Sequence, residues 1–442
     1  MENTKKSKLR NSVSLKLIVI VILSLLLLIP TFFIRSLIDE RQTRRNEAIL
    51  EVTSRWGQPQ TLFAPVILIP YETYEKTSSK TFITHKNYMH ILPDELEITG
   101  NMDPEIRPRG IYKVVLYRAN LNVTAVFTEE SFRDWPDSPG KILWSEAMLA
   151  MGISDLTGLD NISFMQWNDD TLNAESGIPY TSDISTGIHA PVNLLTEGTN
   201  TFHMQFGLNG SESLHFIPAG KSTKVNLTSD WTTPSFDGSS LPDEREITEE
   251  GFVAEWNILH LTRPFPQKWA NNSYSYVIPE SAFGVSLLIP VDLYQKTTRS
   301  VKYALLFIGL TFLLIFFIEV SSKLRIHAVQ YLLIGAALVI FYSLLLSLSE
   351  HLPFAWAYLI AGSGIVGLIV SFVQTLFRKK AYTLVTMGML VILYGFLFAI
   401  LHLSDLALLL GNIGLFIILA VVMFYSLRID WYNERSPEAG GE

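Results

Sequence analysis

The sequence predicts an α-helical membrane protein with six transmembrane helices and a large, mainly β (α+β) domain inserted between helices 1 and 2. Three observations lead to this fold class. Hydrophobic residues make up 48% of the chain and charged residues 17%, which is more apolar than an ordinary soluble protein. The apolar residues are concentrated near the N-terminus and beyond Tyr303, whereas the middle is polar and alternates as strands do. The short connections between the later apolar runs alternate between basic and non-basic.

The first apolar run, "LKLIVIVILSLLLLIPTFFI", occupies residues 15–34 and follows a basic N-terminus at residues 1–14. It is long enough to cross a hydrocarbon core of about 30 Å. No small-x-small cleavage site follows it, so we expect an uncleaved signal anchor and not a secretory signal peptide. The helix is expected to continue to about Trp56, where Gly57 and Pro59 end it.

The remaining spans follow the polar middle region and form a predicted five-helix bundle at residues 301–428, with a cytoplasmic tail at 429–442. Basic residues lie on alternate connections, and "SLSEHLP" and "HLSD" carry no Lys or Arg, so both termini are expected in the cytoplasm and residues 35–300 outside it. Several arginines also flank the outer end of the first span, but long loops translocate largely regardless of charge. The five predicted spans are Tyr303–Ile318, Ala328–Leu346, Phe354–Phe377, Ala381–Leu401 and Leu406–Leu427.

The outer domain reads mostly as β-structure. The stretches "IYKVVLYRANLNVTAVF", "LHFIPAG", "STKVNLTSDW" and "FVAEWNILHL" alternate apolar and polar residues, as half-buried strands do. "SEAMLAMGISD" predicts a short helix with Ser145 as its N-cap.

The outer domain also contains two pairs of similar sequence stretches. "LPDELEIT" at Leu92–Thr99 recurs as "LPDEREIT" at Leu241–Thr248, and "LIPYETYEK" at Leu68–Lys76 resembles "LIPVDLYQK" at Leu288–Lys296. Chance together with shared strand chemistry is one explanation. The others are two related β subdomains, or a domain whose first and last strands run side by side.

The junction between this domain and the second span is the candidate site. Basic and aromatic residues beside a span commonly anchor it at lipid head groups. The alternative is a coupling collar between the β domain and the bundle. Its candidate residues are Asp292, Tyr294, Gln295, Lys296, Arg299, Lys302 and Tyr303.

Other chemistry is sparse in the sequence. A net charge of −8 gives no reason to expect nucleic acid, and the absence of cysteine removes disulfides and thiolate metal sites. We find no motif for a metal, a cofactor or a catalytic nucleophile. Glu319 predicts either an interfacial pair with Lys323 or a proton-carrying group, and the glycines around Ser363 predict close helix packing.

Four stretches together resemble the CreD family of inner-membrane proteins, also called cell envelope integrity proteins. They are "RNSVSLKLIVI", "LPDELEITG…RPRGIYKVVLYRA", "PSFDGSSLPDEREITEEGFVAEWNILHL" and "FGVSLLIPVDLYQKTTRSVKYALLFIGLTFLLIFFIEV". The resemblance implies a bacterial inner-membrane protein under a two-component regulator, linked to envelope integrity and to colicin tolerance. It implies no reaction, ligand or catalytic residue.

We therefore expect a protein that is not an enzyme and acts in envelope integrity or stress adaptation through a periplasmic binding or scaffold domain. Its expected partners are the lipid bilayer and an unidentified envelope component or protein. The main rival is a transporter or lipid-handling protein that uses the bundle. A third alternative is an enzyme acting on envelope polymers, which would need an Asp/Glu pair assembled by the fold.

Overall fold

The computed structural model describes residues 13–76, 82–133, 141–178, 186–271, 273–287, 293–322, 326–402 and 407–427. The chain divides into two compact units, one formed by Met1–Arg44 with Val291–Glu442 and the other by Arg45–Pro290. We call them the membrane unit and the β unit. Their boundary falls inside helix α3 (Leu28–Trp56), so this helix contributes residues to both.

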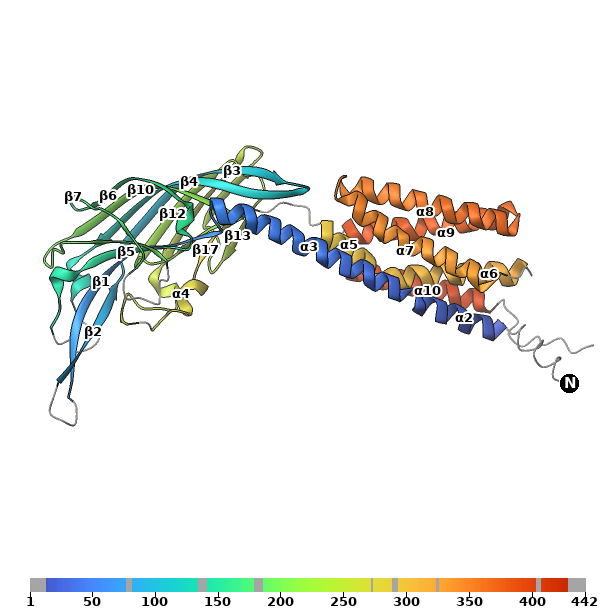
Figure 1. Cartoon of the computed structure of the whole chain (residues 1–442), viewed down its shortest axis with the longest axis horizontal. Helices are drawn as coiled ribbons and strands as arrows, with labels where there is room; N and C mark the ends of the chain where they lie inside the picture. The colour runs from blue at the N-terminus through green and yellow to red at the C-terminus, as the bar shows by residue number, and fades with distance from the viewer. Residues whose placement is uncertain are drawn as a thin grey trace, which may run out of the picture. The chain divides into compact units, whose positions relative to one another are not determined.

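The membrane unit is helical, and within the described residues five helical segments are long and apolar enough to cross a membrane. The first of them runs from Lys16 to Trp56, which confirms the predicted extension of the N-terminal helix as far as Trp56. A shorter apolar helix covers Leu409–Phe424. The helices are α2 (Val13–Leu26), α3, α5 (Leu293–Lys302), α6 (Ala304–Ser322), α7 (Ala328–Ser349), α8 (Phe354–Phe377), α9 (Lys380–His402) and α10 (Ala407–Ser426), of which α6 to α9 form a bundle (Figure 1).

Aromatic side chains fill part of the bundle interior. The ring of Phe341 on α7 makes edge contacts with Tyr394 on α9 at 4.9 Å and with Tyr358 on α8 at 5.5 Å between centroids. The predicted close approach at the glycine-rich stretch of α8 occurs at Gly362, whose added Cβ would lie 3.4 Å from the Tyr394 ring. Gly364 and Gly367 have no such neighbour within 4 Å.

The β unit contains two large sheets, which we call sheet A and sheet B. In the described residues sheet A has nine strands and sheet B has eight. Sheet A runs in the order β13 (Pro234–Gly238), β17 (Phe283–Leu287), β11 (Ser213–Ile217), β1 (Gln60–Lys76), β5 (Met148–Ile153), β9 (Gly187–Pro191) and β8 (Glu175–Ser176), with β2 (Phe82–Ile91) and β16 (Lys268–Ala270) paired beside β1. Sheet B runs in the order β14 (Glu244–Thr248), β15 (Gly251–Leu259), β12 (Ser222–Ser229), β3 (Glu95–Arg109), β4 (Tyr112–Phe127), β10 (Asn200–Ser211), β6 (Leu159–Trp167) and β7 (Asp170–Thr171).

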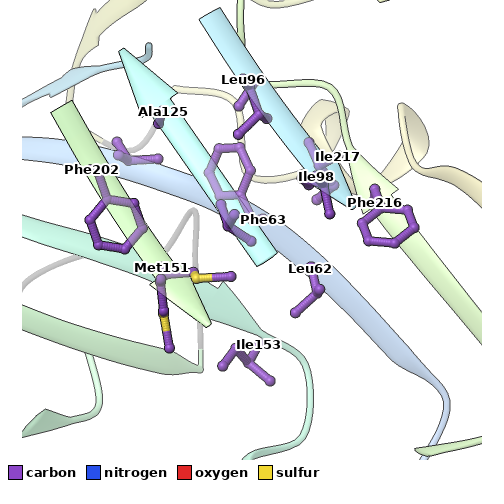
Figure 2. Packing of buried hydrophobic residues seen from close by; sticks show 14 of the residues in the cluster. Leu62, Phe63, Leu96, Ile98, Ala125, Met151, Ile153, Phe202, Phe216 and Ile217 are labelled. Carbon is purple, nitrogen blue, oxygen red and sulfur yellow. The ribbon is translucent and has the colours of Figure 1, made fainter. Parts of the chain in front are cut away.

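The core of the β unit lies between the two sheets, and both contribute to one cluster of buried side chains. Figure 2 shows Phe63 and Met151 of sheet A beside Phe202 and Ala125 of sheet B. Sheets that pack face to face in this way bury alternate residues of each strand. The alternation read from the sequence is therefore the signature of this sandwich.

The four predicted strand stretches are confirmed as β4, β11, β12 and β15. The predicted helix capped by Ser145 is wrong. Ser145 lies inside a single 3-10 turn, Trp144–Glu146, and the residues after it form β5, of which Leu149 to Ile153 are all buried. Because β5 lies within sheet A between β1 and β9, its apolar residues are buried on both faces, and this overrides local helix propensity.

The first and last strands of the β unit, β1 and β17, belong to the same sheet but do not pair directly. Strand β11 lies between them, parallel to β1 and antiparallel to β17. The similarity of Leu68–Lys76 to Leu288–Lys296 cannot be followed structurally because residues 288–292 lie outside the described ranges.

The two LPDE stretches adopt the same local structure. Each aspartate precedes the first strand of a hairpin and donates its N–H to a carbonyl of the partner strand: Asp94 to Val126 and Asp243 to Glu255. The carboxylate of Asp94 then accepts the N–H of Thr128, and that of Asp243 accepts the N–H of Asn257, in each case two residues further along. Both hairpins lie in sheet B.

The end of α3 that belongs to the β unit packs on the outward face of sheet B. Ile49, Val52 and Trp56 contact Val114 and Leu116 at the start of β4. The indole N–H of Trp56 donates to the carbonyl of Tyr117 at 3.3 Å, and its ring lies under the guanidinium groups of Arg107 and Arg118 at 4.5 and 5.1 Å. The next three side chains on this face of β4, Arg118, Asn120 and Asn122, are polar and exposed.

Candidate functional site

Glu319 is a buried carboxylate on α6 whose two oxygens are both hydrogen-bonded. One oxygen accepts from the ammonium of Lys16 at 2.5 Å and from the backbone N–H of Ile326 at 2.9 Å. The other accepts from the hydroxyl of Tyr331 at 3.0 Å. The side chain is only 3% exposed. A carboxylate so deeply buried is stable only when it is paired and hydrogen-bonded, and these contacts provide both.

Glu350, at the other end of α7, has a looser version of the same arrangement. Its carboxylate is 8% exposed and lies 3.8 Å from the guanidinium of Arg41 on α3. The hydroxyl of Tyr294 on α5 donates to the same carboxylate oxygen at 3.4 Å.

The two clusters share a chemical pattern: a basic residue and a tyrosine both contact a buried glutamate. The basic residue comes from the N-terminal helices α2 and α3, and the tyrosine comes from the rest of the membrane unit. Tyr331 lies in the first turn of α7 and Glu350 caps its last turn. A helix of this length is about 33 Å long. The N-terminal helices are therefore tied to the bundle near both ends of α7.

The structure places the predicted junction residues from Tyr294 to Lys302 on a short helix, α5, with Tyr303 directly after it, and brings Tyr294 into a cluster. Tyr294 is buried and contacts Glu350, whereas Gln295 and Lys302 are exposed and Arg299 and Tyr303 are partly exposed. Lys296 lies 5.5 Å from the ring of Phe354. Asp292 lies outside the described residues.

Glu319 belongs to the other cluster. Lys323 lies outside the described ranges, and the ion pair that the structure shows is with Lys16. Ser363 is exposed, and its hydroxyl donates to the carbonyl of Ile360 at 3.2 Å.

Sequence reasoning missed Lys16, Arg41, Tyr331 and Glu350. A signal for Lys16 was present, because it is an ammonium within the first apolar run and an ionisable residue there requires a partner. The identity of that partner was not readable, since the pair joins residues 303 positions apart.

A groove between α8 and α9 is the other notable feature of the membrane unit. Its volume is about 460 Å³. It is bordered by aromatic rings and by small residues, among them Tyr358, Ser363, Gly367 and Tyr394. Its lining is almost wholly apolar, as expected of a surface that contacts hydrocarbon.

The β unit has its own buried charges. Burial acts to raise the pKa of Asp94, but hydrogen bonds from Lys221, Ser131 and Thr128 outweigh it and lower the pKa of this carboxyl below its ordinary value. Burial lowers the pKa of Arg263 to about 10. Its guanidinium donates to the carbonyls of Pro218 and Ala219 and to the side chain of Gln267. In the described part of the chain, no group of three or more His, Cys, Asp or Glu side chains is arranged to hold a metal ion.

Known proteins resemble this chain over nearly its whole length. The family model described as "Inner membrane protein CreD" matches residues 12–432. Inner membrane protein CreD of Escherichia coli (strain K12) is 33% identical over 424 residues, which cover 94% of this chain and 92% of that protein.

Similar solved structures match this chain much more weakly. The M1 zinc metallopeptidase of Deinococcus radiodurans is 9% identical, with 38% of each chain covered and a TM-score of 0.20. The same enzyme as a variant bound to a Tyr-Ser-Ala substrate gives a TM-score of 0.19 over 38% of this chain and 39% of that one. Similarity this low supports no argument about fold or chemistry. The two sequence matches, by contrast, show that the chain belongs to the CreD family of inner membrane proteins.

Proposed function

We propose that this protein maintains the cell envelope as a six-span inner-membrane protein, and that its β unit lies in the periplasm and works by binding an envelope component. Catalysis plays no part in this proposal. The alternation of basic connections supports the orientation, and the apolar α10 supplies the sixth span.

The observation that carries the proposal is the state of Glu319. A proton-coupled transporter needs an ionisable group in its membrane region that can exchange partners during the cycle. Glu319 instead has Lys16, Ile326 and Tyr331 fixed on its two oxygens, and these contacts join α2, α6 and α7. The carboxylate thus serves attachment of the N-terminal helix, as a support for a domain outside the membrane requires.

An apolar replacement of the whole pair tests this role. In a deletion strain, survival under an envelope stress would be scored for full-length chains carrying Glu319→Leu, Lys16→Met or both. Each single change leaves one charge unpaired and should lower protein accumulation, whereas the double change should restore accumulation and rescue, because well-packed apolar residues can replace a buried ion pair. A double variant that accumulates normally yet fails to rescue would show that the charge itself acts in function, and would favour transport.

The orientation has a separate test, which the absence of cysteine makes simple. Single cysteines at the exposed positions Thr196 in the β unit, His351 between α7 and α8, and Lys379 between α8 and α9 give three reporters. A membrane-impermeant maleimide added to cells with a permeabilised outer membrane should label the first two and not the third. Labelling of the third with the first protected would reverse the proposed topology.

The groove between α8 and α9 favours a second candidate function, the handling of lipid by the bundle. Leucine at Gly367 would fill the groove, and leucine at Gly364 is the matched control, because an added Cβ meets nothing within 4 Å at either position and only Gly367 lines the groove. Lipid handling predicts that only Gly367→Leu abolishes rescue. Our proposal predicts that both variants rescue.

A further inference from the structure

The outward face of sheet B carries rows of uncharged amide and hydroxyl side chains in register across neighbouring strands. The first row crosses five neighbouring strands. On β12 and β3, Asn226 lies opposite Thr99, and Thr99 in turn lies opposite Asn122 of β4. Asn122 lies opposite Gln205 of β10, and Gln205 lies opposite Phe164 of β6. Directly opposite residues of paired strands point to the same face of a sheet. Strands are about 4.8 Å apart, so the row presents a side chain at each such step.

The next row repeats the pattern. Thr228, Asn101 and Asn120 lie opposite one another on β12, β3 and β4, and Asn120 lies opposite Gly207 of β10. Neither row contains a charged residue from β12 to β6. We call the four amides Asn120, Asn122, Gln205 and Asn226 the amide face.

The amide face has hydrogen-bonding capacity that the protein does not use. Among the described residues, none of its four side chains makes a hydrogen bond, and Asn120 and Asn122 are exposed. The neighbouring Thr228 and Asn101, by contrast, bond to each other at 3.0 Å. Each primary amide offers two donors and one acceptor oxygen. The sheet holds these groups at fixed spacing, which lowers the entropy cost of binding.

Phe164 adds an apolar surface at the end of the first row. Its side chain is 39% exposed and lies directly opposite Gln205. An exposed ring beside amides offers a flat apolar surface next to hydrogen-bonding groups, a combination that suits a molecule with hydroxyls on its edge and C–H groups on its face.

We propose that the amide face and Phe164 bind an uncharged stretch of a polysaccharide or glycan strand. Sugar hydroxyls both donate and accept, as the four amides do, and the C–H face of a sugar ring fits against the phenyl ring. The absence of Lys and Arg from both rows makes a phosphate-bearing ligand a poor match. A protein partner would be expected to dock on a central cluster of large apolar or aromatic residues, and the rows offer one exposed ring. This inference rests on the proposed function and names the class of its ligand.

The test uses the full-length protein in nanodiscs with chitohexaose and with purified sacculi as probes. Wild type should bind chitohexaose and cosediment with sacculi. Asn122→Ala/Gln205→Ala and Phe164→Ala should each weaken binding about tenfold or more, as loss of central contacts does. Asn257→Ala, an exposed amide of the same face on β15 outside both rows, should leave it unchanged. Unchanged thermal unfolding would show that each variant is folded.

Rescue of the deletion strain separates the two proposals. Loss of both binding and rescue in the Asn122→Ala/Gln205→Ala variant supports both. If wild type binds neither probe, while this variant still loses rescue, the ligand is not a glycan and a protein partner becomes the better explanation. If the variant loses glycan binding but rescues fully, the glycan site stands and the proposed function fails.

Discussion

Leu92–Thr99 and Leu241–Thr248 differ only at their fifth position, yet they end in very different surroundings. The first runs into β3, which lies between β12 and β4 in sheet B, and the second into β14, which forms an edge of that sheet. The differing residue is Leu96 in the first and Arg245 in the second; Leu96 is 1% exposed, whereas Arg245 is exposed. Ile98 is likewise buried, and its counterpart Ile247 is 48% exposed.

The comparison shows that a shared turn does not determine burial. Both aspartates make the same backbone contacts at the start of their hairpins. Only Asp94 gains Lys221, Ser131 and the Thr128 hydroxyl around its carboxylate. Lys221 immediately precedes β12, the second neighbour of β3, whereas β14 lies at an edge of the sheet. The one residue that differs between the two stretches matches its surroundings: Leu96 lies in the central strand β3, and Arg245 lies in the edge strand β14.

Replacing Leu96 in the central strand β3 by arginine should have the largest effect on folding stability. Leu96→Arg would place a guanidinium in the core between the sheets, and we expect a loss of at least about 4 kcal/mol of folding free energy. The full-length protein should then fail to accumulate in the membrane. Normal accumulation with an unchanged unfolding temperature would mean that the core at Leu96 can open to solvent and that the burial contrast is not decisive.

Removing the aspartates should have the next largest effect and should separate the two motifs. We expect Asp94→Ala to cost about 2–4 kcal/mol, because it removes a buried carboxylate from an ion pair and three hydrogen bonds. Asp243→Ala removes an exposed carboxylate with a single backbone partner and should cost about 1 kcal/mol. Equal losses, measured by denaturant unfolding of the β unit's tryptophan signal in the intact protein, would contradict the distinction.

The contribution of Asp94 to folding stability should also depend on pH. Its folded-state pKa is lowered, so its contribution is fully present above the unfolded value of about 3.9 and disappears as the pH falls through the lower folded value. The stability difference between wild type and Asp94→Ala should therefore be constant from pH 7 to about 5 and shrink below pH 4. A difference that grew on acidification would have the wrong sign.

The edge substitution should have the smallest effect on stability. Arg245→Leu changes an exposed residue, so the unfolding free energy should shift by less than about 0.5 kcal/mol. Charged residues on an edge strand oppose pairing with a second copy, so self-association should rise. Size-exclusion chromatography over a range of concentrations measures it, with Arg245→Gln as a control for loss of charge without added apolar surface. A monomer fraction equal to that of wild type would show that β14 needs no such protection.

Much of the architecture was readable from the sequence, for local reasons. Strand β4 was visible because its alternation reflects the two faces of one sheet. The end of α3 at Trp56 was predictable because Gly57 and Pro59, two residues that disfavour helix, follow it. β5 was misread because its burial on both faces depends on neighbours supplied by distant segments. The order of strands in both sheets was not predictable for the same reason.

The candidate sites were less readable than the fold. Glu319 stood out as an acidic residue at the end of an apolar run, but Lys16 and Tyr331 reach it from other helices. Tyr294 was named among the junction residues, and its partner Glu350 was not. The amide face appears only once the register of β12, β3, β4 and β10 is known, since its members are spread from Asn120 to Asn226.

The ion pair between Lys16 and Glu319 also has a consequence for the synthesis of the chain. Ribosomes add roughly 5–20 residues per second, so the 303 positions between the two residues take about 15–60 s to synthesise. During that interval Lys16 is already made and its carboxylate is not, and the whole β unit is synthesised in between. Lys16 therefore stays without this partner until α6 has been synthesised, so the contact between α2 and α6 can form only after the β unit has been made.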